Sequence, residues 1–299
     1  MKNSESYLKP SVVQSIKRLD LKAQFIVKGF MHGLHSSPLQ GFSVEFSDHR
    51  KYEPGDDPKD IDWRLYARTD KYYVRKYEAE TNMTGWLVVD SSASMGYSNS
   101  TEQVTKFDYA ISLAAALSYL MIYRQDPVGL ATFDEKLGKS LPPRSKRSQF
   151  GSILSTLSQL RPTGETNVAA ALAQLAGMLK RASLVMVFSD LLGDPEETLR
   201  SVHRLRHAGH DVILFHILGE AEAQFPFRGS VELEDPETGE SLVVDADSVR
   251  GDYLRALEDF RARFRREASN AKFDFVELDV TIPFDKALLE YLIARSKRR

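Results

Sequence analysis

Residues 86–94 are Trp-Leu-Val-Val-Asp-Ser-Ser-Ala-Ser, an apolar run that leads into a short polar loop. A second apolar run ends in a similar way, because residues 184–190 are Leu-Val-Met-Val-Phe-Ser-Asp. Continuous apolar runs of this length are typical of strands that are buried on both faces of a parallel sheet. The carboxyl ends of parallel strands lie at one edge of the sheet, so we expect Asp90 and Asp190 to lie near each other.

The chain from residue 84 onward alternates between apolar runs and helical segments. We expect strands at residues 86–90, 128–133, 184–190, 212–218 and 273–280, with 135–141 as a possible edge partner, and helices at 106–123, 149–160, 168–181, 195–208, 252–267 and 285–297. This alternation predicts an α/β fold, a doubly wound and mainly parallel sheet with helices on both faces. Residues 222–250 interrupt the alternation, and we interpret them as an inserted hairpin that turns at residues 237–239.

The composition is that of an ordinary globular protein. Of the 299 residues, 42% are hydrophobic and 27% are charged, and the net charge is −2. Such a charge gives no global field that would attract nucleic acid or an anionic membrane. The basic clusters at residues 144–147, 261–266 and 296–299 are small, so we expect no nucleic-acid partner. The absence of cysteine excludes disulfides, zinc–thiolate sites and cysteine nucleophiles, and it fits a reducing compartment.

Two features of the sequence bear on where the protein works. Residues 1–21 are polar and amphipathic and lack the apolar run of a signal peptide. The longest apolar-rich stretch, residues 111–122, is too short to span a bilayer. We therefore expect a cytoplasmic location and no membrane span.

Polar side chains that follow the expected strands form a candidate metal site. Asp90, Ser92 and Ser94 alternate along the loop after the first strand, so their side chains share one side. Thr166 lies in a polar loop just before a helix, and Asp190 ends the second apolar run. Five oxygen ligands without imidazole or thiolate suit a hard cation such as Mg²⁺ or Mn²⁺. Only two of the five are formally charged, so we expect an open position for water or an external carboxylate.

These five residues resemble the metal-ion-dependent adhesion site of von Willebrand factor A-like domains. That pattern is Asp-x-Ser-x-Ser, then a threonine in a glycine-rich loop, then an aspartate at a later strand end, and its order matches across residues 85 to about 295. The resemblance implies that the five side chains bind Mg²⁺, with Mn²⁺ or Ca²⁺ as alternatives, and that an acidic residue of a protein partner completes the coordination shell. The family often has Thr-Asp-Gly at the last position, where this chain has Ser-Asp-Leu at residues 189–191.

Residues 1–83 precede the expected von Willebrand factor A-like domain, which we place at residues 84–299. They combine one or two helices with an extended stretch rich in glycine, proline, aspartate and aromatic residues, and we expect them to pack on the main domain. The charged side chains of this region form either an internal salt-bridge network or a contact surface for a partner.

Two phrases in this region, Tyr-Glu-Pro-Gly-Asp-Asp (52–57) and Ile-Asp-Trp (61–63), resemble the signature of the bacterial domain-of-unknown-function family 58. Members of that family carry a von Willebrand factor A-like domain. The resemblance implies that the protein works with a MoxR-type AAA+ ATPase, as a partner or adaptor in a chaperone-like system.

An alternative function is that of a metal-dependent phosphohydrolase that uses Asp90 as its nucleophile, as in haloacid dehalogenase-type phosphatases. Those enzymes use Asp-x-Asp, whereas Ser92 replaces the second acid here. No histidine has an evident place beside Ser92 or Ser94 to act as a base. We therefore expect a non-catalytic, metal-dependent protein–protein interaction module rather than an enzyme.

The histidines suggest no second metal site. His203 and His207 are four residues apart on an expected helix, but the neighbouring arginines indicate a solvated face. His216 lies in an apolar strand, and we expect it to be a core residue.

Overall fold

The structure is a computed structural model that describes residues 9–36, 49–52, 61, 66, 70–75, 84–98 and 104–289. The chain divides into two compact units, one of Met1–Met31 with Met83–Arg299 and one of His32–Asn82. Most of the 41–80 region, the basic cluster at 296–299 and the end of the expected last helix lie outside the described residues.

The unit of residues 32–82 contains a short two-stranded ribbon. Strands β1 (His49–Lys51) and β2 (Tyr73–Arg75) pair antiparallel, and Arg50 lies opposite Val74. The ribbon continues in the backbone hydrogen bond that the Tyr52 N–H donates to the Tyr72 carbonyl, at 3.0 Å.

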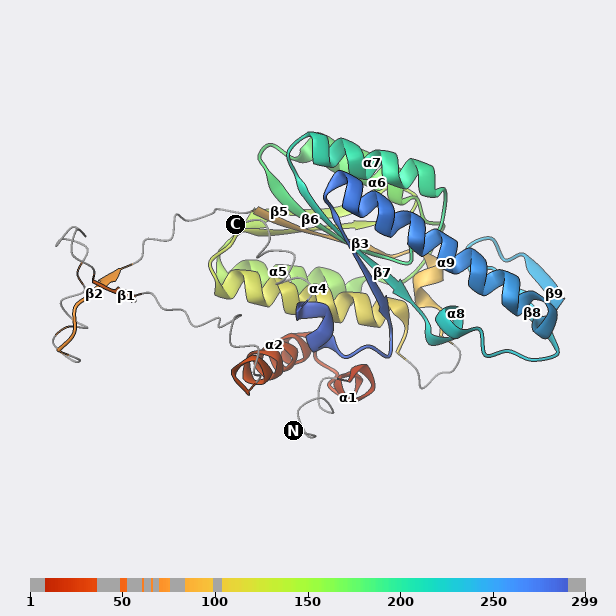
Figure 1. Cartoon of the computed structure of the whole chain (residues 1–299), viewed down its shortest axis with the longest axis horizontal. Helices are drawn as coiled ribbons and strands as arrows, with labels where there is room; N and C mark the ends of the chain where they lie inside the picture. Colours follow the sequence, from red (N-terminus) through yellow and green to blue (C-terminus); the bar gives the residue numbers. More distant parts are fainter. Residues whose placement is uncertain are drawn as a thin grey trace. The chain divides into compact units, whose positions relative to one another are not determined.

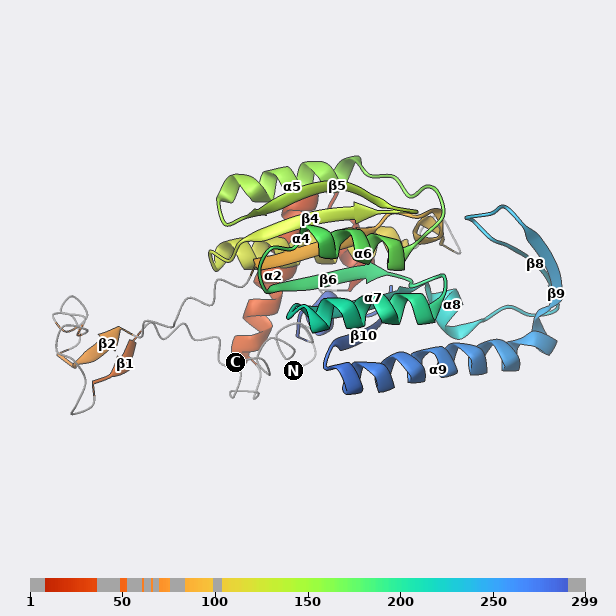
Figure 2. The same cartoon turned by 90° about the horizontal axis from the view of Figure 1, so that it is seen from above.

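The larger unit is built on a six-stranded sheet in the order β10-β7-β6-β3-β4-β5 (Figures 1 and 2). The strands are β3 (Thr84–Asp90), β4 (Val128–Phe133), β5 (Leu137–Arg144), β6 (Ser183–Ser189), β7 (Asp211–Leu218) and β10 (Asp274–Asp279). All neighbours pair parallel except β4 and β5, so β5 is an antiparallel edge strand. The chain moves from β3 to β4 on one side and returns to β6 on the other side. The carboxyl ends of β3 and β6 therefore form the topological switch point, where α/β sheets bind ligands.

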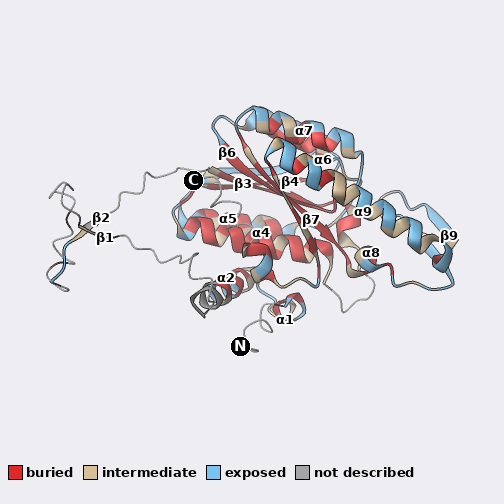
Figure 3. Cartoon of the chain, viewed as in Figure 1, coloured by how far each residue is buried: buried red, intermediate tan, exposed pale blue. Residues whose placement is uncertain are grey.

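Helices cover both faces of this sheet, as the doubly wound prediction requires. One face carries α6 (Val168–Met178), α7 (Pro195–His207) and α9 (Ala246–Ala271), whose apolar side chains share a core with β3 and β6. The other face carries α4 (Lys106–Tyr123) and α5 (Arg147–Gln159) (Figure 1). Helices α1 (Pro10–Gln14) and α2 (Leu19–Ser36) lie on this second side. Figure 3 shows that burial is concentrated in the strands and along α4. The α/β fold is confirmed.

Helix α9 begins at Ala246, earlier than the expected start at residue 252. The cause is local, because the Asp245 side chain accepts a hydrogen bond from the Asp247 N–H and caps the first turn. Between β7 and α9, the short helix α8 (Glu220–Gln224) is followed by a hairpin of β8 (Ser230–Glu234) and β9 (Ser241–Asp245).

Within the described residues, no helix is both long enough and apolar enough to cross a membrane.

Candidate metal centre

Two buried acids lie at the switch point of the sheet. Asp90 is the last residue of β3, and Asp190 follows the last residue of β6. These strands pair parallel, with Val89 opposite Phe188, so both carboxylates emerge at the same edge. Asp90 is 0% exposed and Asp190 is 2% exposed. The expected proximity of the two acids follows from this register.

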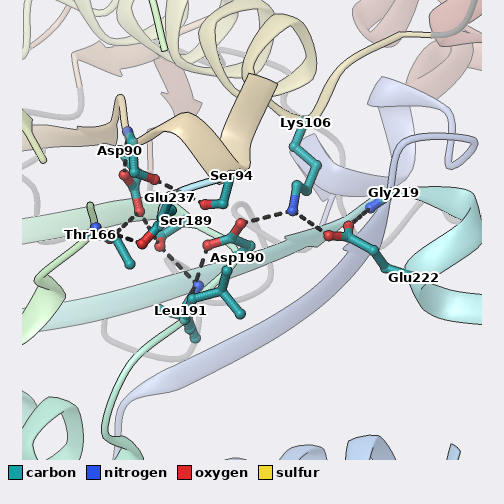
Figure 4. A network of polar contacts seen from close by, with 12 residues as sticks. Asp90, Ser94, Lys106, Thr166, Ser189, Asp190, Leu191, Gly219, Glu222 and Glu237 are labelled. Carbon is teal, nitrogen blue, oxygen red and sulfur yellow. Dashed lines mark hydrogen bonds and ion pairs between the residues drawn. The ribbon is translucent and has the colours of Figure 1, made fainter. Parts of the chain in front are cut away.

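Asp90 is the hub of the cluster (Figure 4). Its Oδ2 accepts hydrogen bonds from Thr166 Oγ1 at 2.9 Å and from Ser189 Oγ at 2.6 Å. Its Oδ1 accepts from the Ser92 N–H at 3.0 Å, and Ser92 Oγ lies 3.1 Å from Ser94 Oγ. The structure therefore brings together the predicted residues of all three loops.

Backbone hydrogen bonds hold two of these loops against each other. The Ala93 N–H donates to the Gly164 carbonyl at 2.9 Å, and the Thr163 N–H donates to the Ser91 carbonyl at 2.8 Å. Gly164 has a φ of +77°, a conformation that glycine adopts without steric cost. Ser91 is further fixed to the end of β4, because its N–H and its Oγ both donate to the Phe133 carbonyl. The positions of Ser92 and Thr166 are thus set by main-chain contacts.

Asp190 forms a buried ion pair that the sequence did not suggest. Lys106 Nζ lies 2.8 Å from Asp190 Oδ2 and 2.5 Å from Glu222 Oε1, and the lysine side chain is 1% exposed. Glu222 Oε2 in turn accepts from the Gly219 N–H at 2.6 Å. Burial alone would lower the pKa of Lys106, but the two carboxylates outweigh it and hold the pKa above its usual value. The sequence held one sign that Lys106 is unusual, because a lysine in the first turn of a helix is unfavourable beside the positive end of the helix dipole.

The hydrogen-bond donors to Asp90 are neutral groups, whereas the buried cation Lys106 is paired with Asp190 and Glu222. Burial, and then the negative charge of Asp190, raise the pKa of Asp90 to about 7. The hydrogen bonds from Ser189 and Ser92 act in the opposite direction but do not cancel this effect. A carboxylate with such a pKa is stabilised in its charged form by a nearby cation.

The donor set fits a hard divalent cation. Among the described residues, no group of three or more His, Cys, Asp or Glu side chains is placed to hold a metal. The candidate centre instead combines two carboxylates with the hydroxyl groups of Ser92, Ser94 and Thr166, all oxygen ligands of the kind that Mg²⁺ takes. Asp190 Oδ2 is occupied by Lys106, so this carboxylate has only Oδ1 to offer, directly or through water.

The loop after β6 has the shape that glycine usually provides. Leu191 stands where the adhesion-site pattern often has glycine, and its φ is +57°. This left-handed conformation costs a non-glycine residue roughly 1–2 kcal/mol. The Leu191 side chain is 2% exposed and packs in the core with α6 and α7, and its N–H donates to Ser189 Oγ at 2.9 Å. The core contact and the hydrogen bond offset the strain.

A further acid reaches the centre from the hairpin. Glu237, in the turn between β8 and β9, accepts a hydrogen bond from the Thr166 N–H through Oε2 at 3.0 Å (Figure 4). No motif or periodicity links these two residues, which are 71 positions apart.

His203 and His216, which the sequence singled out, contact other elements of the larger unit, and His216 lies next to the backbone of Asp190. His203 Nε2 is 3.3 Å from Glu267 Oε2, on the face of α7 that meets α9. His216 packs against the rings of Phe260 and Phe275, and burial lowers its pKa to about 3.

The fold and the cluster together define an α/β domain with a candidate cation site at its topological switch point. Residues 48–263 match the family described as Protein of unknown function DUF58, and the chain belongs to this family. The family resemblance seen in residues 52–57 and 61–63 is thereby confirmed.

Relatives in mycobacteria share most of the chain. Proteins from Mycobacterium bovis and Mycobacterium tuberculosis, each described as uncharacterized, are 29% identical over 261 residues. The match covers 86% of this chain and 81% of each relative.

Solved structures resemble the chain at low sequence identity. The conserved hypothetical protein BatB from Bacteroides thetaiotaomicron is 13% identical, with a TM-score of 0.47 over 72% of this chain and 99% of that one. An aerotolerance-related membrane protein from Bacteroides fragilis is 17% identical, with a TM-score of 0.47 over 69% of this chain and 96% of that one. The SpRpn10 VWA domain is 14% identical, with a TM-score of 0.39 over 69% of this chain and 93% of that one.

Proposed function

We propose that this protein is a non-catalytic, metal-dependent protein–protein interaction module that works with a MoxR-type AAA+ ATPase. The observation that carries the proposal is the arrangement around Asp90. A fully buried carboxylate with a raised pKa is surrounded by hydroxyl groups, while the nearest buried cation, Lys106, is bonded to Asp190 and Glu222.

The residues of the centre would bind an ion through two kinds of ligand, hydroxyl groups and carboxylates. Ser92, Ser94 and Thr166 would bind through their hydroxyl oxygens, and Asp90 would supply the carboxylate that is not already neutralised. Asp190 would act through Oδ1 or through a water molecule. A bound Mg²⁺ or Mn²⁺ supplies a positive charge with an open position, to which a carboxylate of a protein partner can bind.

The contacts of the serines and of Asp90 favour binding over catalysis. Ser92 Oγ and Ser94 Oγ contact each other at 3.1 Å. Asp90 accepts hydrogen bonds on both of its oxygens, and these reduce its strength as a nucleophile. The phosphohydrolase alternative predicts turnover of a phosphoryl substrate that disappears in Asp90→Ala.

The test is capture of the MoxR-type ATPase of the same organism, with purified proteins in Mg²⁺ or in EDTA. We expect capture in Mg²⁺ by the wild-type chain and by Ser152→Ala, which alters an exposed serine on α5. We expect loss of capture in EDTA and in Ser92→Ala, which removes one hydroxyl and leaves the hydrogen bonds from Thr166, Ser189 and the backbone N–H of residue 92 to Asp90 in place. Capture that is equal in Mg²⁺ and EDTA would refute the proposal.

A further inference from the structure

The hairpin of β8 and β9 is an arm with little packing along its length. Near its base, the Gly229 N–H donates to Asp247 Oδ2 at 2.9 Å, and the Ala246 N–H donates to the Gly229 carbonyl at 2.8 Å. Along β9, the apolar side chains of Leu242 and Val243 are 63% and 66% exposed. The arm is therefore held mainly at its base and at its tip.

Hydrogen bonds within the tip hold the turn from which Glu237 reaches the centre. Asp235 organises the turn, because its Oδ1 accepts from the Glu237 N–H and its carbonyl accepts from the Gly239 N–H, both at 2.8 Å. Gly239 has a φ of +74°, which permits the tight reversal. Pro236 lines a surface hollow together with Ala93 of the Asp90 loop. The tip thus borders the same hollow as the loop that carries Ser92 and Ser94.

The Glu237 carboxylate is only half satisfied at this position. Its Oε2 accepts from the Thr166 N–H, and Thr166 Oγ1 donates to Asp90. Its Oε1 is buried and has no hydrogen-bond partner within the described residues. An unpaired buried acceptor costs about 1–3 kcal/mol, and more when it is charged. A cation held by the neighbouring hydroxyl groups would satisfy this oxygen.

We propose that Glu237 is the internal acidic ligand of the centre and that the hairpin tip occupies the position which a partner's carboxylate must take. This inference rests on the proposed function. The isolated chain would hold its cation with Glu237 in place, and a partner would gain access only when the tip lifts. The sparse packing of the arm keeps the cost of lifting low, so the hairpin regulates the site by competition.

The test uses Mn²⁺ as the probe and compares Glu237→Gln with Glu240→Gln. Both changes remove one negative charge from the same turn, but Glu240 is exposed. Calorimetry measures the affinity for Mn²⁺, and water proton relaxation measures how many water molecules reach the bound ion. We expect Glu237→Gln to weaken Mn²⁺ binding by roughly tenfold and to raise the relaxation enhancement, because water replaces the carboxylate. Glu240→Gln should match the wild type in both measurements.

The outcomes separate this inference from the proposed function. If Glu237→Gln equals Glu240→Gln in both measurements while Asp90→Ala loses Mn²⁺, the centre stands and the internal ligand is overturned. If the wild-type chain does not bind Mn²⁺, both proposals are overturned. Because Glu237 lies in a surface turn, its substitution should leave the thermal unfolding temperature in EDTA unchanged or slightly higher.

Discussion

Lys106 and Asp190 form an ion pair beside the candidate centre, with Nζ 2.8 Å from Oδ2 and both side chains at most 1% exposed. The two residues are 84 positions apart, at the start of α4 and after β6. The pair ties the helix on one face of the sheet to the loop at the sheet's carboxyl edge. It also pairs Asp190 with a cation, whereas Asp90 is held by hydroxyl groups and a backbone N–H.

Breaking this pair should destabilise the fold strongly. Lys106→Met keeps the unbranched shape and most of the length of the side chain but leaves Asp190 buried without its cation, a change that typically costs about 3–5 kcal/mol. Urea unfolding in EDTA measures the effect. Lys139→Met, on the exposed face of β5, is the control and should change the stability by less than about 0.5 kcal/mol. A loss of less than about 1 kcal/mol in Lys106→Met would show that the pair is not formed.

Magnesium should stabilise the folded chain through Thr166. A ligand at 100 times its Kd stabilises the state that binds it by about 2.7 kcal/mol. We expect this difference between Mg²⁺ and EDTA in the wild type and most of it to vanish in Thr166→Val, which keeps the shape and removes the hydroxyl. Thr156→Val on α5 is the matched control. Equal gains from Mg²⁺ in both variants would contradict a role for Thr166.

Glycine should be better tolerated than alanine at position 191. Either substitution loses the buried leucine side chain, at a cost of about 2–5 kcal/mol. Leu191→Gly relieves the positive φ, whereas Leu191→Ala keeps the strain and therefore should be less stable by roughly 1 kcal/mol. In the interior of a helix the order of stability is the opposite, because alanine is more favourable there than glycine. Urea unfolding of both variants tests it, and an alanine variant more stable than the glycine variant would refute the left-handed conformation.

His216 should make the protein sensitive to acid. Its pKa is lowered to about 3 in the folded state, so the unfolded state binds the proton more readily. The stability from this group is complete above the unfolded pKa of about 6.5 and falls as the pH drops toward 3, by about 2 kcal/mol at pH 5. His216→Leu should remove this part of the decline, and His207→Leu, which is exposed, should not. Urea unfolding in EDTA at pH 7.5 and pH 5 distinguishes them.

The sequence could predict the elements whose signals are local. Apolar runs identified β3 and β6, and the parallel arrangement then placed Asp90 and Asp190 at one edge of the sheet. The same arrangement placed the loop with Thr166 at this edge of the sheet, because that loop precedes a helix of the alternating pattern. The metal follows from the oxygen ligands and from the adhesion-site resemblance, the MoxR-type partner follows from the family resemblance alone, and both stay predictions.

The contacts that sequence reasoning missed depend on tertiary proximity. Lys106 meets Glu222 across 116 positions, and Glu237 meets Thr166 across 71. No periodicity or motif joins such residues, because side chains of this kind on a helix or in a turn are usually solvated. Their roles became visible only when the register of the sheet and the fold of the hairpin were known.

Calorimetric titration with Mg²⁺ tests the central claim most directly. The wild-type chain and Ser152→Ala should each bind one ion, and Ser92→Ala should bind it more weakly. Asp90→Ala, checked for folding by circular dichroism, should not bind it. Binding of Mg²⁺ by Asp90→Ala and Ser92→Ala with wild-type affinity, or no binding by the wild type, would contradict the assignment of this loop as a metal centre.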